Sequence, residues 1–422
     1  MAGDDCSLHF NLDELTPKQR EDHLSNQVLT AMLQVALLYI AKSEDEVCLY
    51  DTFMHAPWAE GLRNYHRLFA AMGLRPAPPQ QLRYHPVDDF YASVAASVST
   101  CETETLYMVS GSNLPLHNND ALLTVSKNLN SKVHFAAHAP AFGLPVPETL
   151  HCTKAAIDRD RVAAFFAQHQ PPLMLKTLGL AGARNVTTVN SVAEAADYLA
   201  EYGSGMDVIL QQRLRTEDYT EMTVDLFVSD TDIHVTNVRQ IMFADGLWVG
   251  NLMGNAVRLP AHHEQALLQV GEYARSHGYH NSLGFNLGID YFIRNPHAEP
   301  TLPELVVTEI NARWTGGLFP AELVRRLGVQ DQPVVAFIDM CPPQYFNEYQ
   351  RFLERHLYRE TSTAAFTIAP MGFAPFRMNV DGADNLFVWQ VVIGSFDAFK
   401  RARAGELADS VLVTAPNIST GL

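Results

Sequence analysis

Residues 283–317 contain the feature that most constrains the fold, two strand-like runs whose acidic residues lie at matching positions. Asp290 is on the first run, Glu309 and Asn311 are on the second, and a Pro-rich polar connection joins them. This pattern predicts an antiparallel hairpin. Side chains alternate between the faces of a strand, so Glu309 and Asn311 share one face, and pairing can bring Asp290 beside them. The sequence therefore predicts two carboxylates and an amide oxygen at one spot.

Oxygen ligands of this kind indicate a magnesium site. Carboxylate and amide oxygens, without Cys or His, are the ligands that Mg²⁺ takes, commonly together with phosphate oxygens, and Mn²⁺ is an alternative ion. Arg313 follows on the same face and can neutralise charge on a transferred phosphoryl group. Gly316 and Gly317 allow the backbone to approach a substrate closely. The alternative is an ordinary hairpin with solvated acidic side chains.

Composition excludes several classes of partner. The chain has 422 residues, with 30 basic and 47 acidic residues and a net charge of −17, which argues against nucleic acid or an anionic membrane as a partner. No apolar run approaches the roughly 20 residues of a membrane-spanning helix. The five cysteines include no CxxC pair, so neither a disulfide framework nor a thiolate zinc site is indicated. We expect a soluble, cytoplasmic protein.

The order of elements predicts an α/β chain of about two or three domains. Residues 1–131 alternate helix-like and strand-like stretches, and the segment after residue 342 reads as a small α+β region. The pattern predicts helices over 28–41, 155–170, 191–202, 261–276, 346–358 and 395–404. It predicts strands over 47–50, 106–110, 173–176, 208–211, 223–228, 233–242, 247–249, 364–368, 386–393 and 410–413.

A glycine-rich loop is the second candidate phosphate-binding element. The predicted strand Leu173–Lys176 is followed by Gly179 and Gly182, and another strand begins at Val186. Such a loop beside a lysine can wrap backbone N–H groups around phosphates. The Walker order GxxxxGK[ST] is absent, so the pattern alone is also compatible with an ordinary flexible hairpin.

Two arginines are candidates for binding a substrate carboxylate. Arg239 and Arg258 lie in residues 238–260, and a guanidinium can pair with a carboxylate through two parallel hydrogen bonds. Either residue could equally be a surface arginine.

His262 and His263 begin the helix predicted over 261–276. Histidines four positions apart on a helix would share a face and could bind a metal together, but these two are adjacent. We therefore expect both to be surface residues and not metal ligands.

Taken in order, the motifs of residues 132–328 resemble those of the ATP-grasp ligases. In that superfamily a lysine lies eleven positions before the glycine of a G-[IVL]-P-x-P-like turn, as Lys132 lies before Gly143 here. A second lysine ends the strand before the glycine-rich loop, as Lys176 does. The most specific element is the acidic hairpin, with D on one strand and E-x-N-x-R on the next.

The resemblance implies an ATP site and assigns roles to its residues. Lys132 and Lys176 are expected to bind ATP phosphates beneath a lid that contains Gly179 and Gly182. A hinge is expected to meet the adenine, and an acidic residue the ribose; these correspond to Gln211, Gln212, Arg213, Leu214 and Glu221. The metal ligands correspond to Asp290, Glu309 and Asn311, and the catalytic residues to Arg313, Lys176 and Glu309.

Some positions depart from the family pattern. Gln212 stands where glutamate is common, and the long segment before Glu221 leaves Glu217 or Asp218 as alternatives for the ribose. Lys127 is an alternative to Lys132, and the connection between the two acidic strands is long. None of these departures removes the acidic hairpin.

The implied architecture is an α/β fold, α+β in parts, of the ATP-grasp type. The expected domains are a Rossmann-like pre-ATP-grasp domain, a small lid subdomain, a large catalytic subdomain and an α+β appendage, over residues 1–131, 132–215, 216–341 and 342–422.

The implied reaction is ATP-dependent activation of a carboxylate, expected to be an amino acid, as an acyl phosphate that then reacts with an amine, releasing ADP and phosphate. The ends of the chain are more similar to natural-product peptide ligases, of the pheganomycin-like type or the butirosin carrier-protein ligase. One alternative transfers the acyl group to a carrier-protein thiol, which would require a basic docking surface, and the basic clusters are at Arg325–Arg326 and Lys400–Arg403. A non-catalytic nucleotide-binding regulator is a second alternative, and a homodimer is also left open.

Overall fold

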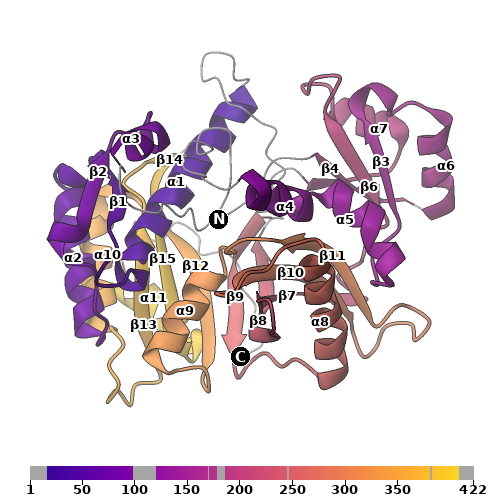
Figure 1. Ribbon diagram of the computed structural model, residues 1–422. Helices are drawn as coiled ribbons and strands as arrows, with labels where there is room; N and C mark the ends of the chain where they lie inside the picture. The colour runs from indigo at the N-terminus through magenta and orange to yellow at the C-terminus, as the bar shows by residue number, and fades with distance from the viewer. Residues whose placement is uncertain are drawn as a thin grey trace. The chain divides into compact units, whose positions relative to one another are not determined.

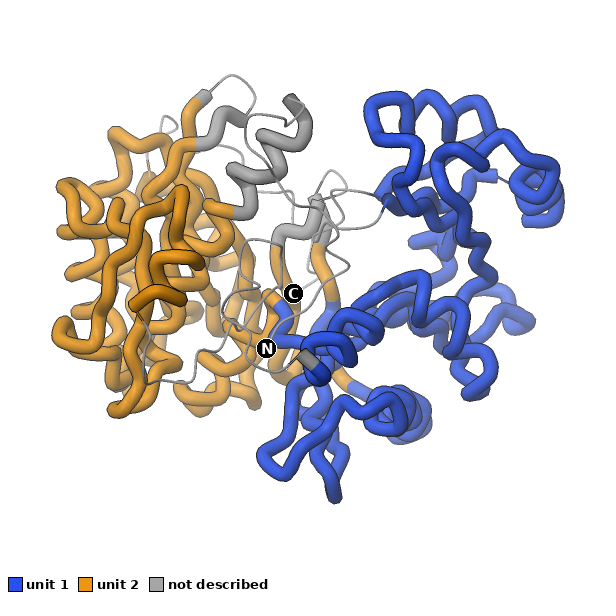
Figure 2. The backbone as a smooth tube through the Cα atoms, turned by 45° about the horizontal axis from the view of Figure 1, so that its top comes forward, with its two compact units in different colours: residues 1–9, 104–240, 259–315 blue, residues 10–103, 241–258, 316–422 orange. Residues whose placement is uncertain are grey.

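The computed structural model describes residues 17–97, 120–169, 171–177, 186–244, 247–380 and 383–407. The chain divides into two compact units (Figure 2). Unit 1 comprises residues 1–9, 104–240 and 259–315, and unit 2 comprises 10–103, 241–258 and 316–422. The strands predicted over 106–110 and 410–413 lie outside the described residues, as do Gly179 and Gly182. The division into four domains stays a prediction.

Unit 1 contains four antiparallel strands in the order β11, β10, β7, β8 (Figure 1). Their bounds are Leu305–Asn311, Phe285–Arg294, Tyr219–Val228 and Ile233–Ala244, and the boundary between the units falls inside β8. The predicted hairpin is confirmed, because β10 and β11 pair with Asp290 directly opposite Glu309.

The two faces of β7 have different partners. Val224 and Leu226 are fully buried and point to the face covered by α8 (Ala261–Ser276), where a Cβ added at Gly271 would lie 3.0 Å from Leu226 Cδ1. Alternation along the strand directs Thr223 and Asp225 to the opposite face. Helix α8 therefore covers only the apolar face of the sheet, and the polar face is available for other contacts.

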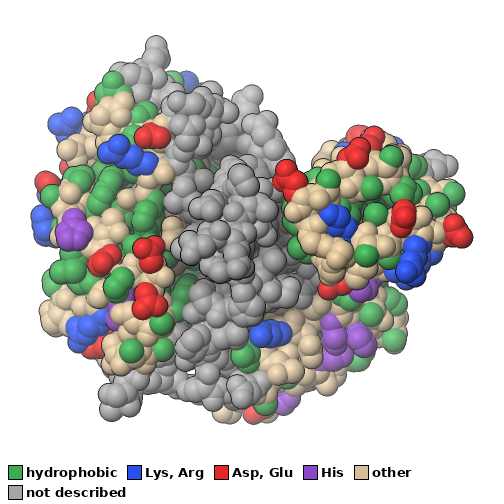
Figure 3. Space-filling view, turned by 90° about the horizontal axis from the view of Figure 1, so that it is seen from above, with side chains coloured by type: hydrophobic (Ala, Val, Ile, Leu, Met, Phe, Trp, Pro, Cys, Tyr) green, Lys and Arg blue, Asp and Glu red, His purple; other side chains and the backbone are tan. Residues whose placement is uncertain are grey.

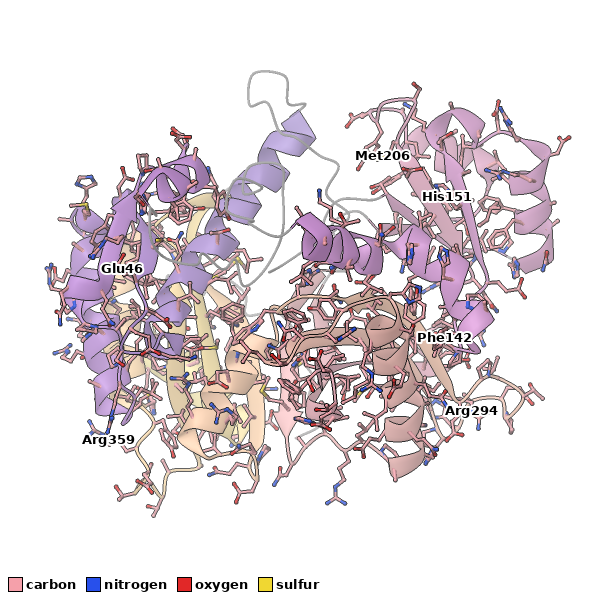
Figure 4. The ribbon with its side chains drawn as sticks, in the orientation of Figure 1. Glu46, Phe142, His151, Met206, Arg294 and Arg359 are labelled. Carbon is pink, nitrogen blue, oxygen red and sulfur yellow. The ribbon has the colours of Figure 1, made fainter. Side chains whose placement is uncertain are left out.

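A smaller antiparallel sheet, in the order β3, β6, β4, β5, forms the rest of unit 1. Helices α6 and α7 cover one face, and Figure 4 labels His151 on β3 and Met206 just before β6. Leu173 and Leu175 belong to this core, whereas Lys176 points the other way. The bounds are Thr149–Thr153, Asp207–Gln211, Leu173–Thr177 and Val186–Val189 for the strands, and Asp160–His169 and Val192–Tyr198 for the helices.

Helices α4 (Asp120–Asn130) and α5 (Lys132–His138) precede this sheet. The Ser131 side chain caps α5 by accepting a hydrogen bond from the His134 backbone N–H at 3.1 Å. A 3-10 turn over Ala139–Phe142, which contains Pro140, follows α5 and ends at Gly143 with a φ of 74°.

In unit 2, β1 and β2 form a parallel pair with α2 between them in the sequence, which is the βαβ order expected of a Rossmann-like segment. Four further strands pair in the order β9, β12, β15, β13, and β14 pairs with β15. The helices are α1 (Pro17–Ile40), α2 (Trp58–Ala71), α3 (Phe90–Ser97), α9 (Leu318–Leu327), α10 (Phe346–Arg355) and α11 (Phe396–Glu406). The strands are β1 (Val47–Tyr50), β2 (Leu82–His85), β9 (Leu247–Gly254), β12 (Pro333–Cys341), β13 (Phe366–Phe373), β14 (Met378–Val380) and β15 (Ala383–Gly394).

Most predicted elements occur in the structure, with two kinds of error. Helix α6 begins five residues later than the 155–170 pattern predicts, because Lys154–Ala156 form a separate 3-10 turn. The second error is omission: the predicted ranges do not include helices α2, α3, α4 and α9 or strands β2, β3, β12 and β14. An apolar run such as β12 has no clear periodicity, because it is buried on both faces. Within the described residues, no helix is long and apolar enough to cross a membrane.

A buried ion pair joins α11 to the sheet of unit 2. Asp339 on β12 accepts hydrogen bonds from Nε and Nη2 of Arg403 at 2.8 and 2.7 Å, and from the Tyr349 hydroxyl at 2.6 Å. All three side chains are buried. The expectation that Arg403 contributes to a basic surface cluster is therefore wrong, because its charge is neutralised in the interior.

Replacement of Arg403 by alanine should destabilise unit 2. The substitution leaves the buried Asp339 carboxylate without its charged partner, which typically costs about 3–5 kcal/mol of the free energy of unfolding. Arg401→Ala is the matched control, because Arg401 is exposed on the same helix. Urea unfolding followed by circular dichroism measures both variants. Equal midpoints for the two variants would contradict a stabilising role for the pair.

Candidate active site

The polar face of the unit 1 sheet places the predicted metal ligands in adjacent rows. Strand register aligns Arg239, Thr223, Asp290 and Glu309 across β8, β7, β10 and β11. The next row contains Asn311 opposite Gly288. Because directly opposed residues share a face, the hairpin brings both carboxylates and the amide together.

The Asp290 and Glu309 carboxyl groups form a partly buried, mutually hydrogen-bonded pair. The Asn311 amide donates to Asp290 Oδ2 at 3.1 Å. Burial, together with the Glu309 charge, raises the pKa of Asp290. Burial would also raise the pKa of Glu309, but the ammonium groups of Lys132 and Lys176 outweigh it and hold that pKa below its usual range.

Two lysines complete the charged cluster. Lys132, the first residue of α5, places its Nζ 3.2 Å from Glu309 Oε2. Lys176 lies on β4, where burial lowers its pKa, while the nearby Glu309 carboxylate opposes that shift. The structure thus brings Lys132 and Lys176, from different segments, to the same carboxylate. Lys127, the alternative to Lys132, lies on α4.

Glu221 belongs to this cluster as well. The expectation that it precedes a strand is wrong, because β7 begins at Tyr219 and includes it. Burial and the charge of Asp290 raise its pKa to about 8, while Lys176 opposes the shift. Of the alternatives for its role, Asp218 bonds to Arg215, with 2.6 Å between the carboxylate and the guanidinium Nε, and Glu217 is exposed.

The donor set fits a divalent cation. Carboxylates this close cannot both stay ionised cheaply. Burial is the main cause of the raised pKa values of Asp290 and Glu221, and repulsion by the neighbouring carboxylate adds to it. A hard cation between the carboxylates would relieve that repulsion, since Mg²⁺ prefers carboxylate and amide oxygens. Asp290, Glu309 and Asn311 are the residues that would hold the ion.

A second network of buried polar side chains lies on the same face of the unit 1 sheet. The sequence motifs did not indicate it. Arg239 and Asp225 are both buried and form an ion pair. Thr315 links them, accepting from Arg239 Nη2 at 3.2 Å and donating to Asp225 Oδ1 at 3.1 Å. Gly288 leaves room for Thr315, because a Cβ there would come within 2.2 Å of Thr315 Cγ2. The alternation of polar and apolar residues over 221–226 is the signal that could have indicated this face.

This network bears on the predicted role of Arg239. Its guanidinium contacts a carboxylate of the chain itself, Asp225, and also Asn237. Thr223 lies opposite Arg239 and donates a hydrogen bond that lowers the pKa of Asp290, against the larger effect of burial. Binding of a substrate carboxylate by Arg239 stays a prediction.

Helix α4 holds the end of β11 from the side. The Ser126 hydroxyl donates to the Ala312 carbonyl at 3.0 Å, and the Asn130 amide donates to the Ser126 carbonyl at 2.7 Å. Arg313 follows directly, is buried, and lowers the pKa of Asp290 against the larger effect of burial. Helix α4 therefore fixes the segment that carries Arg313, and it also ends shortly before Lys132 in the chain.

The remaining predicted residues lie in several places. Gln211 ends β6 and is buried, with its amide donating to Thr149 Oγ1 at 2.8 Å. The hinge continues outside regular secondary structure through Gln212, Arg213 and Leu214. Unit 2 contains the exposed Arg258 together with Gly316 and Gly317, so their substrate roles stay predictions.

No family model matches the sequence, and no curated protein matches it. Among solved structures, the chain is similar to phosphoribosylamine–glycine ligase from Thermotoga maritima, with 13% identity, a TM-score of 0.53, and coverage of 90% of this chain and 95% of that one. It is also similar to N5-carboxyaminoimidazole synthase from Aspergillus clavatus in complex with ADP, with 12% identity, a TM-score of 0.49, and coverage of 89% and 94%. Identities this low bear on the fold alone. The described elements and the similarity to the Thermotoga maritima structure identify the chain as a mixed α/β protein with the ATP-grasp fold.

Proposed function

We propose that this protein is an ATP-dependent ligase that activates a carboxylate as an acyl phosphate and joins it to an amine. The observation that carries the proposal is the convergence of Lys132 and Lys176 on the partly buried Asp290–Glu309 pair. The solved structures similar in fold include a ligase and a synthase crystallised with ADP, which is consistent with nucleotide chemistry.

The charges of the cluster suit a nucleotide triphosphate that is bound with a cation. Lys132 and Lys176 can contact phosphate oxygens, and the carboxylates of Asp290 and Glu309 would hold the cation. A polyanion bound at the lysines would relieve the repulsion between the two ammonium groups. A cation bound at the acidic residues would relieve the repulsion between the carboxylates. Mg²⁺ bound there would neutralise charge between the β- and γ-phosphates during transfer.

The reaction needs an activated carboxylate because a carboxylate oxygen is a poor leaving group. Attack of a substrate carboxylate oxygen on the γ-phosphorus forms a C–O–P linkage, breaks the β–γ bond and releases ADP. An amine then attacks the acyl carbon, phosphate leaves with the C–O bonding electrons, and the amine loses a proton. The products are an amide, ADP and phosphate.

The side chains of the cluster would act by positioning and by charge. Lys132 and Lys176 would orient the triphosphate for in-line transfer. Arg313 would stabilise charge on the transferring phosphoryl group and then on the oxyanion that the amine attack forms. Asn311, hydrogen-bonded to Asp290, would keep that carboxylate oriented toward the same spot.

We favour a small amine, such as an amino acid, as the acceptor over a carrier-protein thiol. A carrier protein is commonly acidic and would need a basic docking surface. In the described residues, the Arg325 and Arg326 guanidinium groups both bond to Glu322, with Nε–carboxylate distances of 2.7 and 2.6 Å. Lys400 pairs with Asp397 at 2.8 Å. On the face in Figure 3, basic and acidic side chains are interspersed.

The charge argument concerns the acceptor and does not identify the carboxylate substrate, which we propose is an amino acid. An amino acid carboxylate and an amino acid amine would together make a dipeptide, as expected from the resemblance to natural-product peptide ligases. This narrower assignment is part of the proposal.

Replacement of Glu309 by glutamine should lower turnover by at least about 100-fold, because it removes one ligand charge and the partner of Lys132. Glu299→Gln is the matched control, since Glu299 is an exposed residue on the connection between β10 and β11. Phosphate release from ATP, Mg²⁺ and pooled amino acids measures both. Full activity in Glu309→Gln would refute the metal assignment, and no phosphate release by the wild type with any amino acid would refute the ligase proposal.

Lys176→Ala and Lys132→Ala should each weaken ATP binding by about 10–100-fold, the effect of losing a hydrogen bond to a charged group. Lys127→Ala should leave the affinity unchanged, because in the structure it is Lys132 that reaches Glu309. Titration of the Mg²⁺-bound nucleotide, followed by calorimetry, compares the three variants. A larger loss in Lys127→Ala than in Lys132→Ala would reverse the assignment of the first lysine.

Incubation with ATP, Mg²⁺ and amino acids should yield a soluble amide whose mass equals donor plus acceptor minus water. Turnover should depend only weakly on ionic strength, because a small acceptor needs no long-range electrostatic steering. If product forms only with a carrier protein present, and Arg325→Glu or Lys400→Glu slows its loading, the thiol alternative replaces the amine.

A further inference from the structure

Two histidines and a glutamate of unit 1 form a second cluster outside the proposed active site. His262 and His263 are the second and third residues of α8, and Glu304 is the residue just before β11. His262 Nε2 lies 2.7 Å from Glu304 Oε1, and His263 Nε2 lies 3.3 Å from the same oxygen. One ligand atom from each of the three residues lies within 4.8 Å of the other two. The expectation that both histidines are surface residues is wrong for His263.

The buried ring of His263 distinguishes this cluster from an ordinary surface pair. His263 is 7% exposed, and neither of its buried ring nitrogens has a hydrogen-bond partner. The 3.3 Å approach to Glu304 lacks hydrogen-bond geometry. An imidazole buried without a partner costs free energy, and a metal–nitrogen bond would satisfy one of its nitrogens.

The spacing of the ligand atoms is near that of a tetrahedral metal site. Zinc binds imidazole nitrogen and carboxylate oxygen at about 2.0–2.2 Å, so two ligands of a tetrahedral ion lie roughly 3.4 Å apart. The 3.3 Å separation between His263 Nε2 and Glu304 Oε1 matches this distance. The shorter His262 contact, at 2.7 Å, would have to open by about 0.7 Å to reach that spacing. Both His262 and Glu304 have exposed side chains that can adjust.

The backbone that carries Glu304 is held in place. The Arg294 backbone N–H donates to the Glu304 carbonyl at 2.9 Å. The Arg294 side chain, labelled in Figure 4, donates to the carbonyls of Pro300 and Leu302 at 2.6 Å each. The carboxylate is therefore presented from an ordered connection, opposite the first turn of α8.

We propose that His262, His263 and Glu304 form a binding site for a divalent transition metal of the zinc class. Two imidazoles and one carboxylate are a donor set of zinc sites that keep a fourth position open for water. Mg²⁺ prefers oxygen ligands, so the donor set would distinguish this site from the one at Asp290 and Glu309.

Metal bound at this site would affect the acidic hairpin, because Glu304 lies just before β11. Glu304 is five residues before Glu309, so along an extended strand the two carboxylates are about 16 Å apart. A metal bound to Glu304 and to α8 would clip the start of β11 to the helix that covers the other face of the sheet. Metal binding should therefore stabilise the folded state of unit 1.

The test measures binding of Zn²⁺ alone to the full chain after treatment with a chelator. Titration against a chromophoric zinc indicator should give a site whose affinity falls at least about tenfold in His262→Asn, Glu304→Gln and His263→Asn, because even residues that only orient a metal ligand contribute about 10–100-fold. The first two variants change exposed side chains, so they test the site even if His263→Asn fails to fold. Co²⁺ bound in its place should show visible absorption bands that these variants lose.

Two controls separate this site from others. His234→Asn removes one histidine from an exposed pair with Asp232, 2.6 Å apart, and should leave Zn²⁺ binding unchanged. Glu309→Gln should leave it unchanged too, so failure of the ligase proposal does not affect this one. Zn²⁺ should raise the unfolding temperature of the wild type but not of Glu304→Gln. Unaltered affinity and stoichiometry in His262→Asn and Glu304→Gln, or no micromolar Zn²⁺ binding by the wild type, would overturn the proposal.

Discussion

The contact between Asp290 and Glu309 is the constraint on which the site depends. Two partly buried carboxyl groups on neighbouring strands repel each other unless positive charge is near. Lys132 and Lys176 supply that charge from α5 and β4, two elements outside the acidic hairpin. One cluster of charges therefore links three elements of unit 1: the acidic hairpin, helix α5 and the smaller sheet.

The sheet of unit 1 can hold such a cluster because its faces are specialised. Apolar side chains of β7 pack under α8, so the residues between them are directed to the opposite face. There the Asp225–Arg239 pair and Thr315 fill the space beside the metal ligands with satisfied polar groups. A rigid, hydrogen-bonded neighbour keeps ligand side chains in one orientation, which is what a site that acts by positioning requires.

The two sites proposed for unit 1 differ in the hardness of their donors. At Asp290, Glu309 and Asn311 the proposed ligand atoms are oxygens. At the start of the same strand, two imidazoles share the Glu304 carboxylate. Spacing in the sequence argued against the histidines, because adjacent helical residues point in different directions. In the first turn of α8 the partner approaches from another segment, so Glu304 can meet both rings.

The sequence by itself determined the acidic hairpin, the register that opposes Asp290 and Glu309, and most helices and strands, because these depend on local periodicity and turn chemistry. It also indicated the ATP-grasp fold through ordered motifs. Only the tertiary structure decided that Lys132 reaches Glu309, that Arg403 is an interior ion-pair partner, that Glu221 lies within a strand, and that His263 is buried. The physical reason is that charge pairing and burial depend on which distant segments meet, and the pattern of one segment does not contain that information.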